Sequence, residues 1–209
     1  MFDVVAIGEL LIDFIPAGRS VKGYPLYEMY PGGAPVNCLA VLNALGAKTA
    51  FIGKVGEDQF GSFLVNNLKA VGINADGVMR ENKTTTTLAF VHLGDDGERS
   101  FSFIRNPGAD TLLKKEDVDV SIIDQSRIVH FGSVSLTHEP SRHSVLYAVG
   151  YAKKKGKLIS YDPNYRPLLW KNERDAVEWM IRGLAYADIV KVSEEELMLI
   201  TEESDIEKG

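Results

Sequence analysis

The chain has 209 residues, of which 45% are hydrophobic and 25% charged, as expected for a globular protein of one domain or one and a half. Its formal net charge of −6 at pH 7 argues against nucleic acid as a partner, because nucleic-acid-binding proteins present basic surfaces. The lone cysteine, Cys38, excludes an intrachain disulfide and fits a reducing cytoplasm. We expect it to be a small buried core residue on a helix.

The N-terminal segment is apolar but too short to span a bilayer. It contains Asp3, Glu9 and Asp13 and has no basic stretch, so we predict neither a signal peptide nor a membrane anchor. Residues 4–7 form a continuous apolar run that ends at a glycine, which is typical of a strand buried on both faces of a parallel sheet.

Helical and strand-like patterns alternate through the next part of the chain. Apolar side chains near helical spacing predict a helix over residues 34–45, and a glycine stops it. Residues 49–52 read as a second buried strand, and residues 58–71 as a second helix that again ends at a glycine.

The middle of the chain breaks this rhythm. Residues 84–93 and 99–104 are β-rich and flank Gly-Asp-Asp-Gly at positions 94–97, a strong hairpin signal. Residues 24–30 supply another β-rich stretch. We therefore assign these segments to a small separate sheet.

After residue 127 the alternation of strands and helices returns. Strands are predicted over 128–134, 157–161 and 188–192, and helices over 141–155, 173–187 and 193–200. Strands alternating with helices predict an α/β fold, with a mainly parallel sheet covered on both faces.

Common nucleotide-binding motifs are missing from the sequence. It contains neither the P-loop pattern nor a Gly-x-Gly-x-x-Gly after its first strand. Open α/β sheets nevertheless bind ligands beyond the carboxyl ends of their strands. Several residues lie at or just past predicted strand ends, which predicts one shared site: Gly8-Glu9, Gly53, Gly132-Ser133, Asp162 and Ser193.

Two segments in the first part of the chain could bind polyols. Gly32-Gly33-Ala34-Pro35-Val36-Asn37 opens a helix, where glycines allow a ligand to approach and the Asn37 amide can both donate and accept. A plain glycine-rich turn explains this spacing equally well. Asp13 could accept hydrogen bonds from two vicinal hydroxyls, although a solvated aspartate at a strand end is the simpler interpretation.

Two later segments could bind charged groups. Asp162-Pro163-Asn164-Tyr165-Arg166 follows a strand, and Arg166 could hold a phosphate or carboxylate, although it could also be a surface arginine in a proline-rich turn. Ser193-Glu194-Glu195-Glu196 fits a helix capping box, and a capped helix start can also face phosphates.

Several of these blocks together resemble the PfkB, or ribokinase-like, family of carbohydrate kinases. Gly-Glu-x-x-x-Asp at 8–13, Gly-Gly-Ala-x-x-Asn at 32–37 and Gly-x-x-Gly-x-Asp-x-x-Gly at 53–61 match the family in order. Residues 102–110 and 160–170 are similar to fructokinases. The resemblance implies a three-layer α/β/α fold with a small β-sheet lid, formed by about residues 13–31 and 84–106.

The resemblance also implies roles for ten residues. Sugar-binding roles fall on Asp13, Gly32, Gly33, Asn37, Arg105 and Arg166. Phosphate or nucleotide contacts fall on Asn164, Lys191 and Ser193, and Glu196 would act on Mg²⁺ mainly through water. The implied cofactors are ATP and Mg²⁺, with a monovalent cation left open, and the lid implies a homodimer.

The implied activity is the ATP-dependent conversion of fructose to fructose 6-phosphate. A kinase for 2-keto-3-deoxygluconate or a riboside, and a non-catalytic sugar-binding protein, remain as alternatives. The family's catalytic Gly-Ala-Gly-Asp does not occur, and Gly108-Ala109-Asp110 lacks its second glycine. We therefore expect the chain to be the N-terminal portion of such a kinase, without the C-terminal third, without the catalytic aspartate and without kinase activity.

Overall fold

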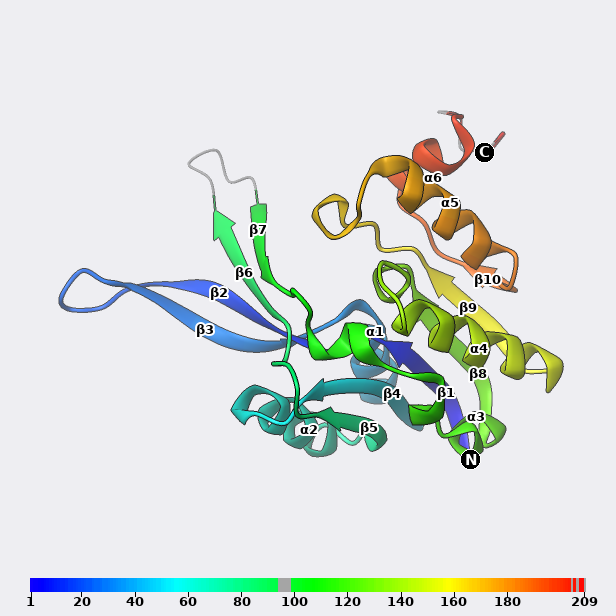
Figure 1. The fold of residues 1–209 in the computed structure, drawn as a ribbon, viewed down its shortest axis with the longest axis horizontal. Coiled ribbons are helices and arrows are strands. Elements are labelled where there is room, and N and C mark those ends of the chain that lie inside the picture. The colour runs from blue at the N-terminus through cyan, green and yellow to red at the C-terminus, as the bar shows by residue number, and fades with distance from the viewer. Residues whose placement is uncertain (94–98, 204, 206, 209) are drawn as a thin grey trace.

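The computed structural model describes residues 1–209 except 94–98, 204, 206 and 209. Its larger sheet has six strands in the order β10-β9-β8-β1-β4-β5, and every pairing among them is parallel (Figure 1). In chain order they are β1 (Phe2–Gly8), β4 (Thr49–Gly56), β5 (Asn74–Glu81), β8 (Ser126–Gly132), β9 (Leu158–Asp162) and β10 (Ile189–Val190).

Helices cover both faces of this sheet, as the alternating pattern predicted. One core holds Ala6 and Phe51 of the sheet against α1 (Ala34–Ala44) and α2 (Gln59–Ala70). The opposite core joins the sheet to the remaining helices, which are α3 (Val120–Asp124), α4 (Ser141–Lys154), α5 (Glu173–Leu184) and α6 (Glu194–Thr201). The 3-10 turns are η1 (Ala109–Leu112), η2 (Lys115–Asp117), η3 (Val134–Leu136) and η4 (Pro167–Leu169).

The smaller sheet has four strands in the order β3-β2-β6-β7 and projects away from the larger one (Figure 1). Its strands are β2 (Leu11–Arg19), β3 (Pro25–Gly32), β6 (Leu88–Leu93) and β7 (Arg99–Ile104). The predicted separate sheet is thus confirmed, while the predicted hairpin turn at 94–97 lies outside the described residues. The prediction that residues 84–87 belong to a strand is wrong, because β6 begins at Leu88.

The fold places the carboxyl ends of β1, β8 and β9 beside one another, since these three strands pair in parallel. The chain leaves β1 at Gly8 and enters the small sheet at Leu11, so the two sheets meet above these ends. No helix in the described part of the chain is long and apolar enough to cross a membrane.

Candidate functional site

A cavity of about 740 Å³ lies between the carboxyl ends of the large sheet and the small sheet. Five residues with predicted roles line it, namely Asp13, Gly33, Asn37, Asn164 and Arg166. The small sheet closes one side with Ile15, Val91, Phe101 and Phe103. Polar side chains from distant parts of the sequence therefore face an apolar wall, which is typical of a small-molecule site.

The start of α1 is built from glycines because the chain passes close to its neighbours there. Gly33 has a φ of 117°, and a Cβ at this position would lie 2.5 Å from the Glu9 carbonyl oxygen. A Cβ at Gly32 would overlap the Asp13 carboxylate. Both glycines are therefore required by close packing within the chain, and the approach of a ligand to them stays a prediction.

Asp13 lies half-buried on β2, and its carboxyl group faces the cavity. Burial raises the pKa of Asp13, and the nearby charge of Arg166 opposes that shift. Among the described hydrogen bonds, none has the Asp13 carboxylate as acceptor. Asn37 is exposed on the first turns of α1, so its amide is also available to a ligand.

The loop after β9 brings two further predicted residues to the cavity. Asn164 adopts a φ of 50°, and its N–H donates to Asp162 Oδ1 at 3.2 Å. The second oxygen of Asp162 pairs with Lys191 Nζ at 3.3 Å. Arg166 Nη1 donates to the Tyr165 carbonyl at 2.9 Å, and its guanidinium lines the cavity.

Ser193 and Glu196 form the capping box that the sequence predicted at the start of α6. The Glu196 carboxylate is buried and accepts hydrogen bonds from the N–H of Ser193 at 2.8 Å and of Tyr165 at 2.7 Å. Glu196 thereby ties the loop after β9 to α6. Among the residues that the structure describes, no group of three or more histidine, cysteine or acidic side chains could hold a metal ion. The role of Glu196 toward Mg²⁺ stays a prediction.

Arg105 does not lie where the resemblance placed it. It is not among the residues that line the cavity, and its side chain is only 2% exposed. Its guanidinium donates to Asp110 at 2.6 and 2.9 Å, to Thr137 at 2.9 Å and to the Val134 carbonyl at 3.2 Å.

Asp110 is equally enclosed. Its carboxylate accepts from Arg105 and also from the Thr87 hydroxyl, so it joins the segment before β6 to the segment after β7. With a side chain 1% exposed, Asp110 cannot reach a substrate hydroxyl. The Gly108-Ala109-Asp110 sequence therefore serves the base of the small sheet.

The chain is similar to known proteins over its whole length. The profile of the pfkB family of carbohydrate kinases matches residues 1–209. This chain belongs to that family. It is 45% identical over 207 residues to "Probable fructokinase-5" of Arabidopsis thaliana, covering 98% of the chain and 64% of that protein.

Two solved fructokinase structures share the fold of this pfkB chain. One, from Xylella fastidiosa with bound ATP, has a TM-score of 0.89 at 34% identity and covers 97% of this chain and 64% of its own. The other, from Vibrio cholerae O395 in a fructose, ADP and calcium ion bound form, has a TM-score of 0.88 at 33% identity, covering 99% and 65%. The chain spans 53% to 64% of the length of the curated relatives that it matches.

Three further residues of the pfkB cavity had no separate role assigned from the sequence, although Glu9 and Asp162 were among the strand-end residues that predicted one shared site. Glu9, Cys38 and Asp162 all line it. Cys38 is half-buried at the cavity wall, so the expectation of a buried core cysteine is wrong. Its position directly after Asn37 was the available signal, whereas the contacts of Glu9 involve residues far away in the sequence.

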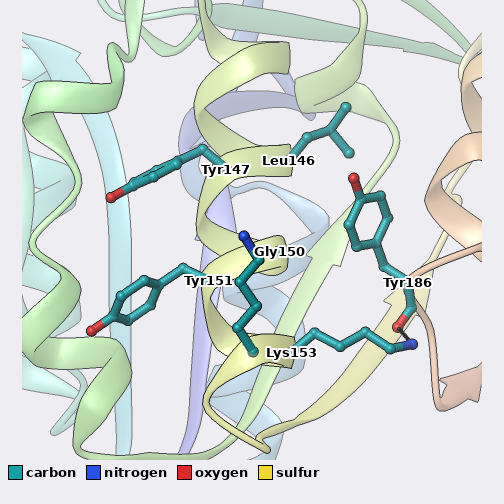
Figure 2. Close-up of a pocket in the computed structure, with 7 residues that line it drawn as sticks. Leu146, Tyr147, Gly150, Tyr151, Lys153 and Tyr186 are labelled. Carbon is teal, nitrogen blue, oxygen red and sulfur yellow. Dashed lines mark hydrogen bonds between the residues drawn. The ribbon is translucent and has the colours of Figure 1, made fainter.

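A second hollow, of about 550 Å³, lies along α4 and has none of the predicted residues in its wall. Figure 2 shows Tyr147 and Tyr151 on one side of this helix and Tyr186 beyond the other side. Lys153 Nζ donates to the Tyr186 carbonyl at 2.7 Å, as expected of a lysine near a helix C-terminus. The predicted site residues Asp13, Asn37 and Arg166 line the larger cavity instead.

Proposed function

We propose that this pfkB chain supplies the sugar-binding part of a kinase that converts fructose and ATP to fructose 6-phosphate and ADP. The observation that carries the proposal is the convergence of Asp13, Asn37 and Arg166 on one cavity. Carboxylate, amide and guanidinium groups can together satisfy several hydroxyls of one sugar. The fructokinase relatives, one of them bound to fructose and ADP, support this substrate.

Each group has a separate task in this proposal. Asp13 accepts hydrogen bonds from neighbouring hydroxyls, Asn37 donates and accepts, and Arg166 balances the charge of Asp13 beside the sugar. Gly33 lets the sugar approach the start of α1. Asn164, Lys191 and Ser193 remain predicted phosphate contacts, and bound ATP supplies the phosphoryl group.

The base that takes the proton from the sugar hydroxyl is not assigned to a described residue. Asp110 is enclosed by Arg105 and Thr87, and no Gly-Ala-Gly-Asp occurs in the chain. We therefore propose that the 209-residue chain binds sugar without catalysing phosphoryl transfer. The Mg²⁺ and the monovalent cation of the family remain predictions, and no step is derived through them.

A kinase for 2-keto-3-deoxygluconate remains the second candidate. The observation in its favour is Arg166, whose described partner is only the neighbouring Tyr165 carbonyl. A guanidinium in this position could bind a substrate carboxylate with two hydrogen bonds. A riboside, like fructose, carries no charged group for Arg166, so this observation does not favour it.

Titration of the purified 209-residue chain with three sugars, followed by NMR, tests these proposals. Fructose is expected to bind at least about 10-fold more tightly than 2-keto-3-deoxygluconate or a riboside, since a mismatched polar contact costs about 1–3 kcal/mol. Asn37→Ala should weaken fructose binding by a similar factor. Asn66→Ala, which changes an exposed residue of α2, should not. Tighter binding of the keto acid would favour the second candidate.

The same sample separates binding from turnover. With ATP and Mg²⁺ added, we expect no fructose 6-phosphate above the level of a protein-free control. Clear turnover that scales with protein concentration would contradict the proposed inactivity of the chain. Absence of fructose binding would overturn the proposed substrate.

We also propose that two copies pair through the small sheet. Strand β3 lies at an edge of that sheet, and it exposes Leu26, Tyr27 and Tyr30. Exposed apolar side chains on an edge strand are a ready surface for pairing with another chain.

A further inference from the structure

Glu9 is a buried carboxyl group at the point where three segments of the chain meet. It follows β1 directly, and the whole residue is only 2% exposed. Glu9 Oε1 accepts a hydrogen bond from the N–H of Ala34 at 3.1 Å, and Oε2 accepts one from the Ser135 hydroxyl at 2.7 Å. The carboxyl group thus joins the first residue of α1 to η3.

The backbone around Glu9 leaves little room for another arrangement. A Cβ at Gly8 would lie 2.9 Å from Pro35 Cγ and 2.9 Å from Ser135 Oγ. A Cβ at Gly33 would lie 2.5 Å from the Glu9 carbonyl oxygen. Glycines on both sides therefore let the Glu9 segment pack directly against the start of α1.

Groups of opposite charge lie near the Glu9 carboxyl group and act on its pKa in opposite directions. Burial raises the pKa of Glu9, while the Ser135 hydroxyl and the charge of Arg105 oppose the shift and the charge of Asp110 adds to it. The hydrogen bond to Glu9 also gives a partner to the backbone N–H of Ala34. The first N–H groups of a helix have no partner within it, and a buried unsatisfied donor costs about 1–3 kcal/mol.

We propose that Glu9 is a positioning residue for sugar binding, which holds the first turn of α1 so that Asn37 faces Asp13 across the cavity. Asn37 lies one helical turn after Ala34, so a shift of the helix start moves its amide directly. This role rests on the proposed sugar-binding function. In this role Glu9 orients the residues that bind the sugar, in addition to the stability that any buried hydrogen bond provides.

The test compares fructose binding by four forms of the 209-residue chain, the wild type and three variants. Glu9→Ala removes both contacts and is expected to weaken fructose binding at least about 10-fold. It should also speed hydrogen exchange of the Ala34 amide, which reports the helix start directly. Glu9→Gln keeps an acceptor for the Ala34 N–H, and its amide N–H can donate to the Ser135 oxygen in place of the bond that Ser135 donates in the wild type. It should therefore restore binding to within about threefold of the wild type.

Asp58→Ala is the matched control. Asp58 also accepts backbone N–H groups at a helix start, from Gly61 and Thr86 at 2.7 Å each, and a hydroxyl, from Thr86 at 2.8 Å. It lies at the start of α2 and not in the cavity wall. We expect it to lower the urea midpoint while leaving fructose affinity unchanged.

The outcomes separate this role from the proposed function. A wild-type chain that binds no fructose overturns both. A wild type that binds, with Glu9→Ala binding equally well, overturns only the role of Glu9. An equal loss of affinity in folded Glu9→Ala and Asp58→Ala would also overturn it, because the loss would then follow stability and not the position of α1.

Discussion

The Asp13 carboxyl group lies in the cavity wall without a described donor, and this state is costly in the absence of ligand. Because burial raises the pKa of Asp13 in the folded state, folding favours the protonated carboxyl group. The contribution of Asp13 to the free energy of unfolding is therefore fully present below its unfolded pKa, and it is lost as the pH rises through its folded pKa. Asp13→Asn should therefore be more stable than the wild type at pH 7. Urea unfolding should show the difference vanishing near pH 3.

The same substitution should harm binding. A hydrogen bond to a charged group contributes about 1.5–3 kcal/mol, so we expect Asp13→Asn to weaken fructose binding about 10- to 100-fold. Asp76→Asn is the control, since Asp76 is exposed, and the described hydrogen bond of its carboxylate is accepted from the neighbouring Asn74 amide. If Asp13→Asn bound fructose as tightly as the wild type, Asp13 would not be part of the sugar site.

For single residues, the sequence predicts which side chains reach one cavity better than it predicts the hydrogen-bond partners of each side chain. Asp13, Gly33, Asn37 and Arg166 reach one cavity because each follows a strand or opens a helix at the same edge of the sheet. The partners of Glu9 could not be predicted, since Ser135 lies 126 positions away and no local pattern links the two. Which polar group a buried side chain meets depends on packing between elements.

At the scale of elements, the buried Arg105–Asp110 pair holds the base of the small sheet. Asp110 binds Thr87 before β6 and Arg105 after β7, and Arg105 continues to Thr137 beyond η3. Asp110→Ala would leave a buried guanidinium unpaired, so we expect a loss of about 3–5 kcal/mol in urea unfolding. The cost arises from the unpaired charge and not from the packing that is removed.

Two comparisons check this cause. Arg105→Met combined with Asp110→Leu should be less destabilising than Asp110→Ala alone, because no buried charge remains. Glu178→Ala breaks the exposed Arg182–Glu178 pair and should cost at most about 0.5 kcal/mol. A cost below about 1 kcal/mol for Asp110→Ala would show that the pair is not needed to hold the sheet.

The elements themselves were predictable where their patterns were strong. The apolar runs predicted β1 and β4, whose described residues are mostly buried, and helical spacing predicted α2 and α4. The edge strand β5 was missed because Asn74–Glu81 is rich in polar residues and contains a glycine. Likewise, the parallel pairing of β2 with β6 joins segments more than seventy positions apart, which no local signal indicates.

The molecule as a whole consists of a parallel sheet with its helices and a smaller sheet that projects from it (Figure 1). The cavity lies where they meet, so residues from both sheets line it. Phe14 and Met29 of the small sheet also pack against the α1 and α2 side of the large one. The position of the small sheet is therefore tied both to the core and to the site.

Edge strand β3 of the small sheet exposes several apolar side chains, and here we predict self-association. Leu26 on edge strand β3 is 44% exposed, and Leu26→Lys should shift a dimer measured by sedimentation equilibrium toward monomer, because it places charge on the pairing surface. Ile181→Lys on α5 is the matched control, since Ile181 is 47% exposed but lies on a helix. A wild-type chain that stays monomeric at high concentration, or equal effects of both variants, would contradict pairing through β3. A selective effect of Leu26→Lys would place the partner copy on the same sheet that closes the sugar cavity.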